Sequence, residues 1–287
     1  QNIFALYFQG EDRLFETITV TLGARADYER IDSEKSNFEF SPKLGISYAS
    51  PLGAKFRLSV GKGFRAPSVA EKFATIDYNG IAVKPNADLL PEHSWSYEIG
   101  GNYDFEFLGS DFYFDASVFQ NDFYDMIEPQ FDSTGAIRFQ NITRARIIGL
   151  EANMRVLILK YFGIETALTW MDPQDLILNE TLKYRSKIMW TAGIFVPFGF
   201  AELQADYRYF SNVDNIDSRL VNLIKDSDAR VPVHVVDARL LFRFDKMFHV
   251  PLTASINVKN LFNYYYLRMV GNLAPTRSIS LQLEGKF

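Results

Sequence analysis

Apolar and polar residues alternate along most of this chain with a period of two. Between residues 14 and 29, for example, Ile18 and Val20 alternate with Thr19 and Thr21. Alternation over such a length is typical of a β-strand with one apolar and one polar face. The same pattern returns along the chain and predicts thirteen strands, at residues 2–9, 14–29, 37–48, 55–65, 93–104, 111–126, 138–157, 163–171, 182–197, 200–210, 231–244, 251–261 and 277–287. No amphipathic helix of useful length is predicted, so the expected fold class is all-β.

The segments between the predicted strands are short and long in turn. The short ones are 10–13, 49–54, 105–110, 158–162, 198–199 and 245–250, and the long ones are 30–36, 66–92, 127–137, 172–181, 211–230 and 262–276. In an antiparallel up-and-down sheet, this order places all short turns at one end and all long loops at the other. Such sorting is typical of a transmembrane β-barrel of the outer-membrane kind, with short periplasmic turns and long extracellular loops.

The apolar faces support a wall in contact with lipid. Each carries about five or six side chains, often with an aromatic residue near the strand end, which matches a lipid-facing band of ~25 Å between two aromatic girdles. Examples of such aromatic residues are Tyr28, Tyr48, Trp95 and Trp190. The net charge of -5 argues against nucleic-acid binding. The absence of cysteine excludes disulfide scaffolds, thiolate metal sites and cysteine nucleophiles.

The predicted strand number indicates an incomplete barrel. A single-chain bacterial barrel has an even number of strands, and open strand edges in lipid would leave peptide groups unpaired. We therefore expect further strands before Gln1. The first and last strands should both run from the long-loop end to the short-turn end, which places the break in a long outer loop. Residues 1–287 are accordingly expected to form one incomplete domain, the C-terminal portion of a barrel.

Three segments of the sequence resemble those of a known family. VGKGFRAPSVAEKF at 60–73 leads into the loop at 66–92, PNADLLPEHSWSYEIGGNYDF at 85–105 leaves it, and NVKNLFNYYY at 257–266 precedes a last strand that ends on Phe287. In this order they resemble the C-terminal half of TonB-dependent outer-membrane receptors. The resemblance implies a barrel of about twenty-two strands, of which the last thirteen are present here. It also implies a plug domain with a TonB-contacting box, and neither is identified in this sequence.

The loop at 66–92 is the best candidate for ligand contact. It has 27 residues, and a loop of that length is normally functional or disordered. Lysines would attract an anionic ligand, and aromatic rings would stack on a planar one. The predicted ligand contacts are Lys72, Phe73, Tyr78, Asn79 and Lys84. The residues of the family motifs are expected to shape the loop and stabilise its base instead: Arg65, Ala66, Pro67, Pro85, Asn86, Leu89, Pro91 and Glu92.

Catalytic chemistry is not predicted. The sequence has no zinc-protease, serine-hydrolase or nucleotide-loop motif, so we expect no enzyme activity, no cofactor and no resident metal. His93 and His234 lie near the long-loop ends of their strands and could in principle ligate haem iron. Haem receptors of the family carry a histidine between the two loop motifs, and residues 68–85 contain none. His249 lies at a short turn, where a structural role is expected.

The resemblance therefore implies active import across the outer membrane of a Gram-negative bacterium. The ligand would be a scarce molecule of the ferric siderophore or cobalamin class, and the energy would come from the TonB complex through a plug outside this chain. Other expected partners are the remaining strands, outer-membrane lipids and, in some receptors, a surface lipoprotein. A haem or glycan importer of the same fold and a passive porin-type channel are alternatives. An outer-membrane enzyme using His93 or His234 and a soluble ligand-binding barrel are rivals from other classes.

Overall fold

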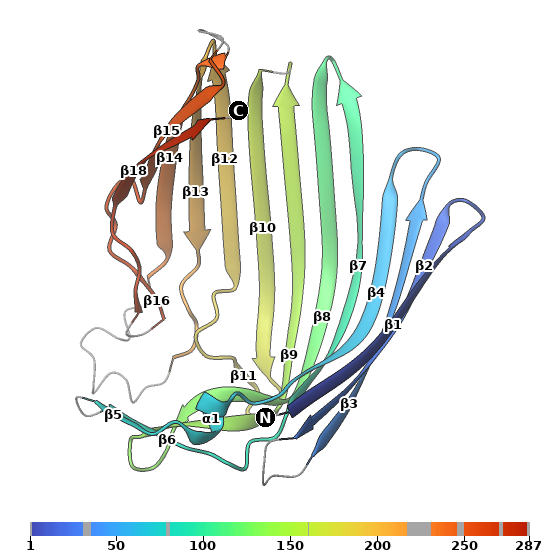
Figure 1. The fold of residues 1–287 in the computed structure, drawn as a ribbon, viewed down its shortest axis with the longest axis vertical. Coiled ribbons are helices and arrows are strands. Elements are labelled where there is room, and N and C mark those ends of the chain that lie inside the picture. Colours follow the sequence, from blue (N-terminus) through green and yellow to red (C-terminus); the bar gives the residue numbers. More distant parts are fainter. Residues whose placement is uncertain are drawn as a thin grey trace.

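The computed structural model describes residues 2–30, 36–78, 81–159, 161–216, 231–245, 250–269 and 272–285. Within them, thirteen strands follow one another in chain order in one antiparallel sheet, which confirms the predicted number (Figure 1). These wall strands are β1 (Asn2–Leu14), β2 (Ile18–Arg30), β3 (Asn37–Ala49), β4 (Lys55–Arg65), β7 (Glu92–Phe107), β8 (Ser110–Phe131), β9 (Ile137–Ile158), β10 (Phe162–Asp175), β12 (Ile188–Phe198), β13 (Ala201–Phe210), β14 (Val233–Arg243), β15 (Leu252–Lys259) and β18 (Ser278–Gly285).

Shorter elements occupy the long loops. They are α1 (Val69–Phe73), β5 (Ile76–Tyr78), β6 (Ile81–Lys84), β11 (Glu180–Thr181), β16 (Leu267–Met269) and β17 (Asn272–Leu273). Figure 1 shows the short turns at the top and these loop elements at the bottom, so the two kinds of connection are sorted as expected. In the described residues, no helix is long and apolar enough to cross a membrane.

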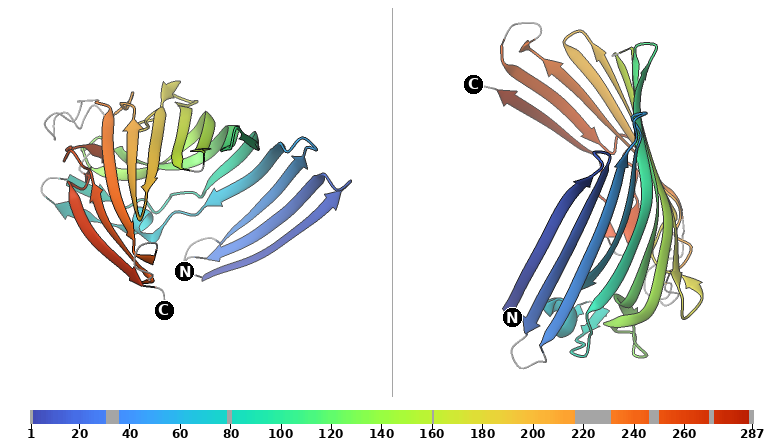
Figure 2. Two further views of the ribbon diagram at one scale, coloured as in Figure 1. Left: turned by 90° about the horizontal axis from the view of Figure 1, so that it is seen from above. Right: turned by 90° about the vertical axis from the view of Figure 1, so that its right-hand side faces the viewer.

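The sheet curves into an arc that is open between β1 and β18 (Figure 2). In the described part of the chain, each of these two strands pairs with a neighbour on one side only. The views of Figures 1 and 2 agree that α1, β5 and β6 lie at the long-loop end and on the concave side of the arc. The wall is thus a single curved layer, and the loop between β4 and β7 folds back over its hollow side.

The exposure of side chains on the two faces of the wall is the reverse of that in a water-soluble sheet: apolar side chains are exposed and polar ones are sheltered. Along β2, Leu22 is 57% exposed whereas Asp27, on the other face, is only 4% exposed. Every substantial contact between described elements joins hydrogen-bonded neighbours, so no second layer covers the side of Val20 and Leu22. Large exposed apolar surfaces of this kind mark contact with lipid or with another protein. The curvature shelters the polar face, which places the polar side chains on the concave side.

The apolar band has a clear border on the side of the long loops. On β8 the outward positions change from Val118 to Gln120 and Asp122, and Asp122 forms an ion pair with Arg146 on β9. At the other end of the band, the rings of Phe105 and Phe112 are stacked with centroids 5.0 Å apart. Charged side chains on the outward face therefore begin where the wall extends beyond the apolar band toward the long loops. This is the pattern expected of a wall that crosses hydrocarbon and continues into water.

Some predicted boundaries were wrong. The first short turn is not at 10–13, because β1 continues to Leu14 and the turn places Phe15 and Glu16 at positive φ (52° and 60°). The segment 127–137 is mostly strand, since β8 and β9 are 22 residues each and continue to a short turn at 132–136. Finally, β12 begins at Ile188 and not at residue 182. In the first two cases local turn residues were misleading, whereas at 182–187 apolar and polar residues alternate without forming a strand.

Candidate functional site at the long-loop end

The segment 66–91, which we name the strap, connects β4 to β7. Its base is held by Arg65, the last residue of β4. The Arg65 guanidinium donates to Glu92 at 2.8 and 3.1 Å and to Glu71 of α1 at 2.9 and 3.0 Å. Glu92 also accepts a hydrogen bond from the backbone N–H of Ile127 on β8 at 2.9 Å. One cation therefore joins the beginning of the strap to its end and to the next strand pair.

The helix α1 is stabilised by its first residues. Ser68 is the N-cap and accepts from the backbone N–H of Glu71, while the Glu71 carboxylate accepts from the backbone N–H of Ser68 at 2.7 Å. This capping box follows the buried Pro67. Partial burial acts to raise the pKa of Glu71, but the hydrogen bonds from Ser68 and the Arg65 guanidinium outweigh it and hold the pKa below its usual value. Glu71 is thus a stable anion for Arg65.

The far end of the strap lies on the tip of the β8–β9 hairpin. The ammonium group of Lys84 donates to Asp132 at 3.1 Å and to the Thr134 hydroxyl at 2.6 Å. Asp132 also accepts from the backbone N–H groups of Thr134 and Ala136, which shapes the hairpin turn. The Thr134 hydroxyl and the Lys84 amine together hold the pKa of Asp132 well below its usual range. Asp132 therefore organises its own turn and the strap at once.

Two asparagines join the second half of the strap to the hairpin. Asn86 donates to the backbone carbonyl of Phe139 at 2.8 Å. Asn141 accepts from the N–H of Leu90 and donates to the carbonyl of the same residue, both at 3.0 Å. The Asn86 N–H also donates to the carbonyl of Lys72, which ties the two limbs of the strap together. Leu89 lies buried between these contacts.

The predicted ligand contacts have different surroundings. The Lys72 side chain is only 5% exposed and the Lys84 amine is bonded to the hairpin, whereas Phe73 is 44% exposed. Tyr78 ends β5 and its side chain is not described, and Asn79 lies outside the described residues. Of the predicted loop-shaping residues, Arg65, Asn86 and Glu92 make the contacts given above. Pro67 and Leu89 are buried, Ala66 and Pro91 are partly buried, and Pro85 is exposed. Sequence reasoning missed Asp132, Thr134 and Asn141, because nothing local marks them as partners of the strap.

On the other side of the hairpin, the next loop is held in a similar way. Arg185 forms an ion pair with Glu128 of β8 at 2.6 Å. Lys187 pairs with Asp214 at 2.8 Å, and the hydrogen bond to that carboxylate raises the Lys187 pKa above its usual value. Asn215 donates to the backbone carbonyl of Thr181. The hairpin is thus bonded to the strap on one side and to the β10–β12 loop on the other, and the β10–β12 loop is in turn bonded to the segment after β13.

The concave wall between the long loops and the short turns carries paired charges. Arg57 donates to Glu98 at 2.8 Å and to Asp115 at 2.6 and 3.0 Å. Arg208 pairs with Asp237 at 2.7 Å, beside a hollow of about 690 Å³ that is lined mainly by polar and charged side chains. The sequence predicted water-facing charges on this side. The structure adds that many of them are already bonded to one another.

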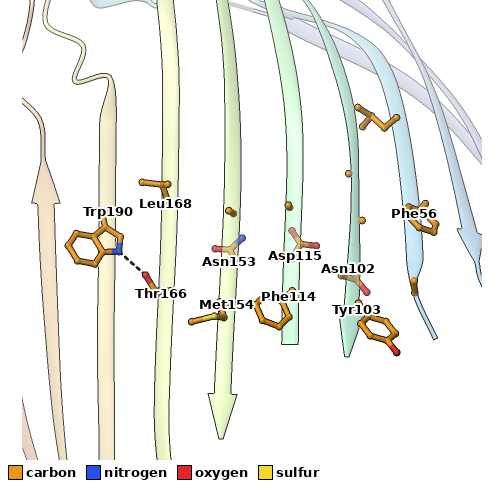
Figure 3. A pocket seen from close by; sticks show the side chains of 16 residues that line it. Phe56, Asn102, Tyr103, Phe114, Asp115, Asn153, Met154, Thr166, Leu168 and Trp190 are labelled. Carbon is orange, nitrogen blue, oxygen red and sulfur yellow. Dashed lines mark hydrogen bonds between the residues drawn. The ribbon is translucent and has the colours of Figure 1, made fainter. Parts of the chain in front are cut away.

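A second hollow, about 830 Å³, lies on the convex face (Figure 3). Its floor is a row of small residues, Gly101, Ala116 and Ala152, which lie opposite one another on β7, β8 and β9. Large apolar side chains surround this row, and the Trp190 indole N–H donates to the Thr166 hydroxyl at 2.7 Å. Because this hollow belongs to the apolar outer band, it is separate from the polar side that a water-borne ligand would meet.

The described histidines have partners. His93 Nε2 lies 2.8 Å from a Glu39 oxygen, and His234 Nδ1 lies 2.7 Å from the Tyr207 hydroxyl. His249 lies outside the described residues. Among the residues that the structure describes, no three His, Cys, Asp or Glu side chains gather in a way that could hold a metal ion.

The fold and the loop site define a class: a β-barrel wall with an apolar exterior, a polar interior and interlocked loops at one mouth. The family model described as "TonB dependent receptor-like, beta-barrel" matches residues 1–261. The chain therefore belongs to the TonB-dependent receptor family, as the sequence motifs implied.

The individual relatives share only a small part of their sequence with this chain. Over 129 residues the chain is 29% identical to a hemoglobin and hemoglobin-haptoglobin-binding protein B of Haemophilus influenzae, which covers 41% of this chain and 12% of the relative. The ferric enterobactin receptor of Pseudomonas aeruginosa superposes with a TM-score of 0.73 at 18% identity, covering 99% of this chain and 45% of that one. The copper transporter OprC gives a TM-score of 0.76 at 14% identity, covering 99% and 48%. These structures show the shared fold, and the chain spans less than half of their length.

Proposed function

We propose that this chain forms the C-terminal part of the wall of an outer-membrane importer in a Gram-negative bacterium. The receptor captures a scarce ligand of the ferric siderophore or cobalamin class at the long-loop end and moves it inward with energy from TonB, delivered through a plug outside this chain. The process is binding and gated transport without covalent chemistry. The observation that carries this proposal is the strap, an ordered loop on the concave side of a wall whose outer face is apolar.

Ferric siderophores are the ligand class that we favour, with cobalamin as the alternative within the same mechanism. The exposed Phe73 ring offers a surface on which a planar or aromatic group can stack. The amine of Lys84 is engaged by Asp132 and Thr134, so we assign it to strap structure and not to attraction of an anionic ligand. Of the other predicted contacts, Lys72 is buried, and Tyr78 and Asn79 stay candidates.

A haem-carrying protein is the second candidate ligand, and a specific finding favours it. The sequence relative from Haemophilus influenzae is named for binding hemoglobin and hemoglobin-haptoglobin. Direct ligation of haem iron by His93 or His234 has less support, because both side chains already have hydrogen-bond partners. In this version, the loops would recognise the protein surface that carries the haem.

Growth on single nutrient sources tests the proposal. A strain that lacks the full-length receptor is supplied with ferric enterobactin, haemoglobin or cobalamin as the sole source of iron or cobalamin, with and without TonB. We expect the strain to fail on one source and to recover with the receptor only when TonB is present. Uptake that persists without TonB would favour the passive channel. Recovery on none of the sources would contradict the proposed ligand classes, and a glycan panel would come next.

A further inference from the structure

The contacts that hold the strap join distant parts of the chain. Lys84 lies 48 residues before Asp132 and 50 before Thr134, and Asn86 lies 53 before Phe139. In addition, β6 pairs in parallel with the start of β9, with Val83 opposite Ile137. The second half of the strap therefore adds a short strand to the hairpin and is bonded to it by several side chains. It is not a free excursion of the chain.

Asn141 provides the most specific of these contacts. Its side-chain amide accepts from the N–H of Leu90 and donates to the carbonyl of Leu90, as the peptide group of a neighbouring strand would do. It also donates to the carbonyl of Asp125 on the opposite strand of the hairpin at 2.6 Å. An asparagine is the smallest side chain that offers a donor and an acceptor in one plane. Its carboxylate analogue would lose the donor and with it the hydrogen bonds to the two carbonyls.

The ion pair between Lys84 and Asp132 at the hairpin tip is the second contact that holds the strap. Asp132 is held in place by its own turn, because it accepts from Thr134 and Ala136. It is therefore positioned before Lys84 arrives. Lys84 adds one charge-assisted hydrogen bond to Asp132 and one hydrogen bond to Thr134. The strap thus binds to a hairpin turn whose carboxylate is already held in position by its own hydrogen bonds.

We propose that the β8–β9 hairpin is a latch that fixes the strap before any ligand binds, with Lys84, Asp132 and Asn141 as positioning residues. The proposal rests on the proposed function only in assigning ligand contact to the strap. A strap that were ordered only on binding would weaken the apparent affinity, because the apparent dissociation constant is the intrinsic one divided by the competent fraction. The latch removes that loss by keeping the competent form populated in the free receptor.

Hydrogen exchange of the ligand-free, full-length receptor in lipid nanodiscs tests the latch without any ligand. Asn141→Asp and Lys84→Met are compared with wild type, and Lys43→Met serves as control because Lys43 is a concave-side lysine away from the strap. We expect amides in 82–91 to exchange about 10-fold faster in the two latch variants, consistent with the loss of a net hydrogen-bond contribution. Exchange in the wall strands and in the control should not change.

Unchanged exchange of residues 82–91 in both latch variants would overturn the proposal. If a latch variant fails to insert, Thr134→Val replaces it, since this change removes the 2.6 Å bond from Lys84 and the hydroxyl's own bond to Asp132 but leaves both charges in place. It should give a smaller increase in the same segment. Faster exchange across the whole barrel would mean a general loss of stability and would also count against a latch.

Uptake measurements separate the latch from the proposed function. Ferric enterobactin and haemoglobin are the two probes, each over a range of concentrations. If the latch positions the strap, Lys84→Met and Asn141→Asp should raise the half-saturation concentration about 10-fold and leave the maximal uptake rate unchanged. Equal loss of both parameters would contradict a positioning role. If wild type takes up neither probe, the proposed ligands are wrong, and the exchange experiment still decides the latch.

Discussion

Gly163→Ala is expected to destabilise the wall through one side chain on the neighbouring strand. Gly163 on β10 lies directly opposite Phe195 on β12, and the Phe195 ring lies over the glycine. A Cβ atom at residue 163 would overlap that ring, so the ring has to leave its position. The backbone of Gly163 is not in the left-handed region, so alanine is otherwise compatible with it. The substitution therefore isolates the close approach of ring and backbone.

The expected cost follows from two opposing effects. Forcing an extra methyl group into a packed contact costs about 1–3 kcal/mol, which includes ~0.5–1.5 kcal/mol for a side chain displaced from its rotamer. Alanine also restricts the unfolded chain, which returns about 0.4–1 kcal/mol. The net destabilisation should be about 1–2 kcal/mol. Because the cost arises from Phe195, it should largely disappear in a Phe195→Ala background.

The measurement is reversible urea unfolding of the full-length receptor in lipid vesicles, followed by tryptophan fluorescence. Wild type, Gly163→Ala, Phe195→Ala and the double variant form a double-mutant cycle. Gly45→Ala is the matched control, because a Cβ there would also be on the concave side but would lie 3.7 Å from the Thr21 Cβ, an ordinary contact. If Gly163→Ala costs the same with and without Phe195, the argument from ring overlap is wrong.

Three further outcomes are expected. Leu150→Arg places a charge on the convex face and should lower the unfolding free energy by about 2–4 kcal/mol when the receptor is in lipid. Glu151→Arg, on the concave side of the same strand, should change the unfolding free energy much less. Similar costs for the two variants would mean that the two faces are misassigned. Arg57→Met leaves two carboxylates without their shared donor, so it should cost about 1.5–3 kcal/mol in the same unfolding assay, and salt should reduce that cost. The pKa of Asp132 is lowered, chiefly by the Thr134 hydroxyl, so its stabilisation is complete above its ordinary pKa of about 3.9 and is lost as pH falls below it. Hydrogen exchange at residues 132–136, corrected for the intrinsic effect of pH, should accelerate below about pH 4 and stay constant between about pH 5 and 8.

The wall could be predicted from the sequence because its physics is local. Each strand carries its own alternation of apolar and polar residues, and a slip of one residue would turn the whole apolar set inward. The number of strands, their order and the sorting of the connections follow from that pattern. Turn positions were less secure. Gly10 and Asp12 look like turn residues but continue β1, while the turn itself uses Phe15 and Glu16 at positive φ.

The strap shows why the candidate site was harder to predict. From its sequence context, Lys84 is predicted to be a free lysine that attracts a ligand. Only the fold shows that its amine reaches Asp132 and Thr134. Its partners lie about fifty residues away, and their separation in sequence carries no pattern. The same is true of Asn141, which looks like any polar residue on a strand. Local alternation determines which face a side chain is on, and tertiary contacts determine whether it is still available.

The availability of side chains also supports our proposal that the ligand is recognised at the mouth of the barrel. The convex face is apolar over the band that meets lipid, so it can bind no polar ligand from water. On the concave wall, arginines such as Arg57 and Arg208 already have carboxylate partners, with which an anionic ligand would have to compete. The strap differs because its ionic contacts hold its position while Phe73 stays exposed. A ligand that binds there gains contact with the ring without disturbing the charges that position it.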